Sequence, residues 1–221
     1  MTKVSSFHKE GVKGFLHQPP GVVSDGLVLT HGAGGNCETP LLATTAAAFA
    51  AAGVCVLRCD LPFRQQQPRG APHPSSAATD RAALKAAVLA LREILPGRIF
   101  MGGQSYGGRQ GSILAAEEPG LADALLLMSY PLHPPGRPEQ LRTAHFPSLR
   151  TPALFVHGTR DPFGSLDEMR AAVELVPART VLVEIAGAGH DLARGKFDVA
   201  RLVVEPFAAL VRDLTGVPAK A

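Results

Sequence analysis

From Leu27 onward, short apolar segments typical of buried strands alternate with helix-like segments and with turns rich in Gly and Pro. Such alternation is typical of crossover units, in which parallel strands form a sheet that helices cover. A β-sandwich or a helical bundle would not show it. We therefore predict an α/β fold with a mostly parallel sheet flanked by helices on both faces.

The predicted elements are placed by apolar runs, by Gly and Pro, and by helical spacing. The strands are expected at 11–18, 27–30, 54–58, 99–101, 122–130, 153–156 and 180–185, and the helices at about 40–52, 75–95, 106–118, 166–176 and 197–214. The segment before Leu27 has room for one strand, and Pro206 should kink the last helix. The loop 61–74 and the connection 131–150, which holds five prolines, are the longest irregular segments. Neither is long enough for a large lid, so we expect a minimal lid or none.

Length and composition exclude several classes of protein. At 221 residues and 46% hydrophobic, the chain is expected to form a single domain, 1–221. The net charge of +3 is dispersed along the chain, so no nucleic-acid partner is expected. No signal peptide or membrane span is predicted. Three cysteines without metal-ligand spacing indicate a reducing compartment, for which the cytoplasm is the simplest choice, and no metal or cofactor is expected. The oligomeric state stays open.

The segment Gly103-Gln104-Ser105-Tyr106-Gly107 follows an apolar run and precedes a helix-like run. A serine between a strand and a helix in this G-x-S-x-G pattern is typical of a nucleophile elbow, where the hydroxyl is exposed on a sharp turn. The alternative is a serine that simply caps the helix. Because the pattern alone is weak, its partners decide between the two.

Two later strands each end in a loop with a candidate partner for Ser105. Asp161 follows the strand at 153–156, and His190 follows the strand at 180–185. A serine hydroxyl needs a base that removes its proton during attack, and histidine titrates in the right range. A carboxylate at the other ring nitrogen holds the imidazole in place. We predict Ser105 as nucleophile, His190 as base and Asp161 as the orienting carboxylate.

Other residues compete for these roles. Asp60 ends another predicted strand and is the serious rival to Asp161, which has an Asx turn as its alternative role. Asp191 is discounted because it is adjacent in sequence to the base. His31 and His157, each followed by Gly, are interpreted as loop-bracing residues.

Acyl transfer also needs donors for the negatively charged oxygen of the tetrahedral intermediate. An elbow supplies one donor from the N–H of Tyr106. The Gly-rich loop that starts at His31 follows the first buried strand, so the N–H of Ala33 is the second predicted donor. A plain Gly-rich turn is the alternative for that loop, and no phosphate-binding pattern is complete in it.

The segments HGAGG, GGQSYGG, HGTRDPFG and GAGHD, in this order along nearly the whole chain, resemble the α/β-hydrolase superfamily. The small outline is similar to the dienelactone-hydrolase-like esterases and to a hydrolase-like group that includes testis-expressed and histone-acetyltransferase-complex subunits. The resemblance implies an α/β-hydrolase fold and hydrolysis of carboxylic esters or thioesters through an acyl-enzyme. Some members of the second group act as binding subunits, so the alternative function is a non-catalytic interaction protein.

The expected site is open and shallow, suited to short acyl groups or to an acyl group on a larger carrier. The substrate is therefore expected to be a small ester or an acyl carrier. Arg64 and Arg109 lie in or near segments that should border this site, and either is a candidate to bind a substrate carboxylate. Solvated surface charge is the alternative for both.

Overall fold

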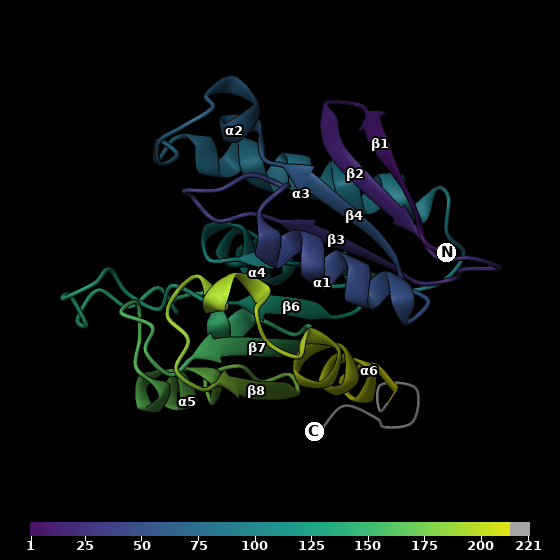
Figure 1. Ribbon diagram of the computed structural model, residues 1–221. Coiled ribbons are helices and arrows are strands. Elements are labelled where there is room, and N and C mark those ends of the chain that lie inside the picture. The colour runs from purple at the N-terminus through teal and green to yellow at the C-terminus, as the bar shows by residue number, and fades with distance from the viewer. Residues whose placement is uncertain (213–221) are drawn as a thin grey trace.

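The computed structural model describes residues 1–212. Its eight strands form one sheet in the order β1-β2-β4-β3-β5-β6-β7-β8 (Figure 1). The strands are β1 (Lys3–Lys9), β2 (Val12–Gln18), β3 (Gly26–Thr30), β4 (Cys55–Asp60), β5 (Ile99–Gln104), β6 (Leu125–Met128), β7 (Ala153–Gly158) and β8 (Thr180–Ile185). From β4 to β8 every neighbouring pair is parallel, whereas β2 pairs antiparallel with both β1 and β4. The predicted α/β fold with a mostly parallel sheet is confirmed.

Helices cover both faces of this sheet and bury two separate apolar clusters. One face is covered by α1 (Pro40–Ala51) and α6 (Glu205–Arg212), both on the near side in Figure 1, which pack around Phe49 and Phe207. The other is covered by α3 (Ser76–Arg92), α4 (Tyr106–Glu117) and α5 (Leu166–Val173). Because both faces are covered, the central strands are apolar throughout, as in the four residues of β6, all of them buried. This rigid core fixes where the strand ends lie.

The chain begins with a hairpin, so the prediction of one strand before Leu27 is wrong. The second strand, β2, matches the predicted segment, and β1 pairs with it from Lys3–Gln18 to Lys9–Val12. Glu10 and Gly11, both with positive φ, form the two-residue turn. Because β1 is an exposed edge strand made mostly of polar residues, it lacks the apolar run that identifies a buried strand.

Two further details differ from the expected elements. The loop after β4 contains a short helix, α2 (Pro62–Gln66). In the last helix, the turn that precedes Pro206, η3 (Ala200–Val204), is a π-helix. Proline has no N–H and crowds the carbonyl one turn earlier, and the wider π turn makes room for it. The predicted end of this helix, Leu214, lies outside the described residues.

No separate lid is found within residues 1–212. The connection between β6 and β7 contains one short 3₁₀ turn, η1 (Phe146–Ser148), and another, η2 (Leu192–Gly195), follows β8. This agrees with the expected absence of a large lid. No helix in the described part of the chain is both long and apolar enough to cross a membrane.

All three cysteines are buried and none forms a disulfide. Burial raises the pKa of the Cys55 thiol to about 11. Burial and the nearby Asp60 carboxylate raise that of Cys37 to about 12, and burial also raises the pKa of Cys59. Each thiol is therefore held in its neutral form.

Candidate active site

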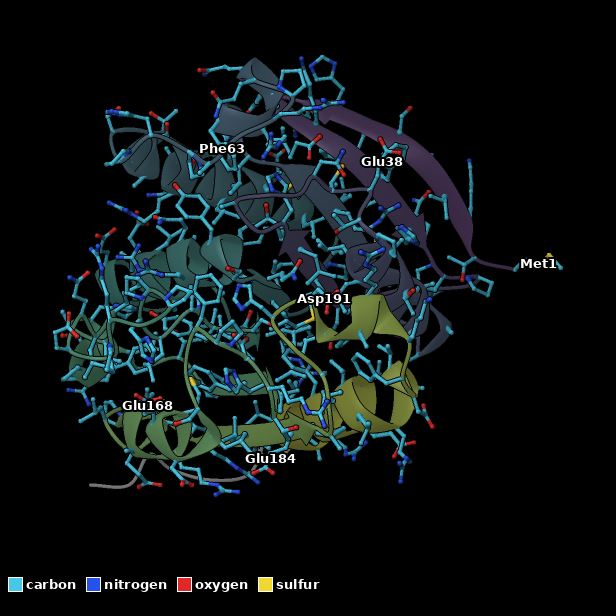
Figure 2. The ribbon with its side chains drawn as sticks, turned by 60° about the vertical axis from the view of Figure 1, so that its left-hand side comes forward. Met1, Glu38, Phe63, Glu168, Glu184 and Asp191 are labelled. Carbon is cyan, nitrogen blue, oxygen red and sulfur yellow. The ribbon has the colours of Figure 1, made fainter. Side chains whose placement is uncertain are left out.

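The candidate residues gather at the carboxyl end of the sheet, where β3, β5, β7 and β8 each run into a loop. Parallel strands bring these ends to the same edge, which is where ligands bind in open α/β sheets. In Figure 2, Asp191, which follows His190, lies near the centre of the view, between Phe63 of α2 and Glu168 of α5. The side chain of Asp191 is 59% exposed, so this part of the loop after β8 lies at the surface of the molecule.

Ser105 occupies a strained turn between β5 and α4. Its φ of 50° and ψ of −114° lie outside the regions that ordinary residues prefer. The turn is tight because Gly107 packs against β3: a Cβ there would lie 2.5 Å from Thr30 Cγ2 and 2.6 Å from the His31 carbonyl oxygen. The sharp turn predicted from the sequence is thus present, and the glycine is required by the close approach of the chain.

Ser105, His190 and Asp161 form a continuous hydrogen-bonded chain. Nε2 of His190 lies 2.8 Å from the Ser105 hydroxyl oxygen, and Nδ1 lies 2.8 Å and 3.0 Å from the two Asp161 carboxylate oxygens. Since a carboxylate only accepts, Nδ1 carries the ring proton and Nε2 is free to accept from the serine. The Asp161 side chain is fully buried, while that of His190 is 23% exposed toward the cleft.

The loops that carry Asp161 and His190 are held together by packing. The ring of Phe163 stacks on the imidazole of His190 at 4.0 Å between centroids. A side chain at Gly158 would collide with the backbone of the His190 loop, because its Cβ would lie 2.4 Å from the Ala188 carbonyl oxygen. Asp161 also accepts a 2.9 Å hydrogen bond from the N–H of Phe163, so it makes the Asx turn as well as the contact with His190.

The rival residues lie elsewhere. Asp60 accepts a 2.7 Å hydrogen bond from the N–H of Cys37 and faces His31, not His190. His31 donates from Nδ1 to the Gly32 carbonyl and accepts at Nε2 from the N–H of Leu61. Burial lowers the pKa of His31, so it remains neutral in this bracing role. His157 is likewise buried and donates to the carbonyl of Gly164, at 2.7 Å.

The loop after β3 lies directly beside the serine. A Cβ at Gly32 would lie 3.3 Å from the Ser105 Cβ, and the N–H of Gly35 closes a turn onto the Gly32 carbonyl at 3.1 Å. Ala33 is therefore at the centre of this turn, and both it and Tyr106 line the cleft. As the first residue of α4, Tyr106 has an N–H without an intrahelical acceptor. Its hydroxyl donates to the buried Asp80 at 2.7 Å, which anchors the ring.

The prediction that Arg64 binds a substrate carboxylate is wrong, because its side chain does not line the cleft beside Ser105. Its guanidinium is buried behind the loop after β3 and donates to four backbone carbonyls at 2.7–3.0 Å, those of Ala33, Gly35, Gln67 and Gly70. With these donors used, Arg64 braces the loop and does not face the cleft.

The cleft beside Ser105 has a volume of about 1070 Å³. This is at the upper end of the range for small-molecule sites, so volume does not restrict it to short acyl groups. Its walls include Ala71–Pro74 from the loop after α2, and Pro131 from the connection after β6. Both predicted border segments therefore contribute.

Three arginines line this cleft: Arg109, Arg142 and Arg194. Arg109 was predicted because it lies in or near a segment that should border the site. Arg142, from the connection between β6 and β7, was missed because nothing local in the sequence marks it. The only signal available was its presence in a segment expected to border the site.

Within residues 1–212, no group of three or more His, Cys, Asp or Glu side chains is arranged to hold a metal ion.

A family model described as an α/β-hydrolase domain matches residues 24–201 of the chain. This span covers β3 to the beginning of the last helix, and includes every predicted site residue.

Solved structures agree at the level of the fold. Dienelactone hydrolase from Anabaena variabilis is 22% identical with a TM-score of 0.69, and the match covers 95% of each chain. Est1E from Butyrivibrio proteoclasticus is 19% identical with a TM-score of 0.69, covering 96% of this chain and 97% of that one. XC6422 from Xanthomonas campestris, an α/β serine hydrolase without a lid, is 16% identical with a TM-score of 0.65, covering 100% and 97%. At these identities the similarity concerns the fold.

Proposed function

The chain belongs to the α/β-hydrolase domain family, and on that basis we propose that it is a serine hydrolase that cleaves carboxylic esters or thioesters. One observation carries the proposal: the Ser105 hydroxyl, the His190 ring and the Asp161 carboxylate are joined by hydrogen bonds of 2.8 Å. This is the arrangement that a serine needs to become a nucleophile at neutral pH.

In the proposed acylation step, the Ser105 oxygen attacks the substrate carbonyl carbon while His190 Nε2 takes its proton. The N–H groups of Ala33 and Tyr106 donate to the negatively charged oxygen that forms. His190 then gives the proton to the departing alcohol or thiol, and the acyl group remains on Ser105. Asp161 stabilises the imidazolium that exists between these two transfers.

Deacylation follows the same route with water as the nucleophile. His190 removes a proton from the water as it attacks the acyl-enzyme carbonyl, and returns that proton to Ser105 as the acid leaves. The lidless cleft suits a small ester or an acyl group on a larger carrier. The cytoplasm is the proposed compartment, supported by the three free cysteines.

Labelling with a fluorophosphonate tests the proposal, because this reagent reports an activated serine without requiring the physiological substrate. We expect an adduct on Ser105 in the native protein, located by peptide mass spectrometry, and none after heat denaturation. Ser105→Ala should remove both the label and the turnover of p-nitrophenyl butyrate.

Ser112 offers a matched control on the same helix, because its hydroxyl also lies 2.8 Å from a histidine nitrogen, Nε2 of His145. Ser112→Ala should keep the label. If folded protein carries no adduct and cleaves neither esters nor thioesters, the non-catalytic interaction protein becomes the better interpretation.

A further inference from the structure

Arg109 lies one helical turn after Ser105 on α4. Its N–H donates to the Ser105 carbonyl at 2.9 Å, and its side chain lines the cleft. Four residues along an α-helix correspond to a rise of about 6 Å. The Nε atom of Arg109 is buried without a hydrogen-bond partner among residues 1–212. A buried guanidinium donor without a partner is costly, and because the same side chain lines the cleft, its guanidinium is placed to donate to a group bound there.

Arg142 lines the same cleft and belongs to the connection between β6 and β7. Its backbone is fixed at both ends, because its N–H donates to the Leu132 carbonyl at 2.8 Å and its carbonyl accepts from the Tyr130 hydroxyl at 2.7 Å. Its guanidinium, in contrast, makes one long hydrogen bond among residues 1–212, 3.4 Å from Nη1 to the Pro131 carbonyl. The position of Arg142 is therefore set while most of its donors remain available.

The two guanidinium groups are close enough to repel each other. Burial lowers the pKa of Arg142, and the charge of Arg109 lowers it further. The same two causes lower the pKa of His145 to about 4, so this neighbour stays neutral and adds no further positive charge. Among the residues that line the cleft, the single carboxylate is Asp191, which pairs with the exposed Arg194 at 3.5 Å. This corner of the cleft is thus positive and lacks a carboxylate of its own.

We propose that Arg109 and Arg142 form an anion subsite, so that the preferred substrate is an ester carrying a second, negatively charged group. A guanidinium binds carboxylate and phosphate through paired N–H donors. Two guanidinium groups in one cleft can together replace the water molecules that hydrate such a group. Because Arg109 follows Ser105 by one helical turn and both residues line the cleft, the anionic group of the substrate would lie near the scissile carbonyl. A monoester of a short dicarboxylic acid fits this description, and a phosphate-bearing ester shares its chemistry.

The proposed substrate class rests on the proposed function, but binding of an anion by the two arginines does not. The experiment therefore measures anion binding separately from ester hydrolysis. Ser105→Ala protein is titrated with monomethyl glutarate, with the neutral dimethyl glutarate and with inorganic phosphate, and binding is followed by NMR chemical shifts. We expect the monoester to bind at least about tenfold more tightly than the diester. Whether phosphate competes with the monoester decides between a general oxyanion site and one selective for carboxylate.

Variants then assign the preference to the two arginines. In the Ser105→Ala background, Arg142→Gln and Arg109→Gln should each remove most of the preference for the monoester. Arg201→Gln, at an exposed arginine that does not line the cleft, should keep it. Arg142 lies outside the helices and strands, so its substitution tests the subsite even if Arg109→Gln fails to fold.

Turnover completes the test with active protein. The ratio of kcat/KM for mono-p-nitrophenyl glutarate to that for p-nitrophenyl butyrate should fall about tenfold in Arg142→Gln. Equal binding of monoester and diester, or a preference that survives both substitutions, would overturn the subsite. Anion binding without turnover of any ester would leave the subsite standing and overturn the proposed hydrolase function.

Discussion

The Nη2 atom of Arg64 lies 2.7 Å from the carbonyl oxygen of Ala33. The N–H of the same alanine is the proposed donor to the reacting oxygen. A buried arginine therefore holds the carbonyl side of the residue whose N–H is that donor. The catalytic geometry of the loop after β3 therefore depends on a side chain that never meets the substrate.

Replacing Arg64 by Met should lower kcat without changing the choice of substrate. The partly buried carbonyls of Ala33 and Gly35 would lose their donors, which costs roughly 1–3 kcal/mol of stability and loosens the loop. Because a displaced oxyanion donor lowers the rate, we expect kcat for p-nitrophenyl butyrate to fall roughly tenfold to a hundredfold. The exposed Arg69 serves as control, and Arg69→Met should change kcat less than about twofold. A change in the preference for anionic esters in Arg64→Met would contradict the bracing role.

Asp161→Asn and Asp60→Asn should differ sharply in activity. Asparagine at 161 cannot stabilise a charged His190 and favours the wrong ring tautomer, so kcat should fall by roughly 10³- to 10⁴-fold. Asp60 faces His31 and the Cys37 N–H, and its substitution should cost less than about tenfold. Steady-state kinetics on folded protein provide the comparison. Similar losses in the two variants would contradict the assignment of the orienting role to Asp161.

Gly107→Ala should destabilise the protein far more than Gly34→Ala. The added methyl at 107 meets Thr30 Cγ2 at 2.5 Å, whereas nothing lies within 4 Å of a Cβ at 34. Overpacking at a backbone contact costs roughly 1–3 kcal/mol, and an open surface position changes stability by about 0.5 kcal/mol or less. Urea unfolding of the two variants measures the difference, and equal midpoints would show that the elbow relaxes easily.

His17 should make the protein less stable as the pH falls. Burial and the nearby Arg58 lower its pKa to about 4 in the folded protein, compared with about 6.5 in an unfolded chain. Above pH 6.5 both states are neutral at this site; between about 6.5 and 4 only the unfolded state takes up the proton, so the free energy of unfolding falls.

Replacement of His17 by Gln keeps an acceptor for Arg58 Nε, which lies 2.8 Å from His17 Nε2. Relative to this variant, the wild type should lose on the order of 1–2 kcal/mol between pH 7 and pH 4.5. Urea unfolding at both pH values provides the test, since subtracting the variant removes the contribution of the carboxylates. A difference between the two proteins that stays constant with pH would show that His17 is not held neutral.

The residues that meet at Ser105 were predictable because each ends a buried strand of a parallel sheet. An apolar run followed by a polar loop is a local signal, and the topology then brings the loop ends to one edge. The β1 strand gave no such signal, since an exposed edge strand needs no apolar run. The bracing by Arg64 and the place of Arg142 in the cleft depend on side-chain direction in irregular segments, which no spacing rule describes.

The burial of the three cysteines has a practical consequence for labelling. A thiol reacts with maleimide as the thiolate, and the raised pKa values of Cys37 and Cys55 leave almost none of that form near neutral pH. Cysteine introduced at a fully exposed position such as Val22 would therefore carry a fluorophore selectively in the native protein. Distance measurements between that fluorophore and a second one attached to Ser105 become feasible without removing any native thiol.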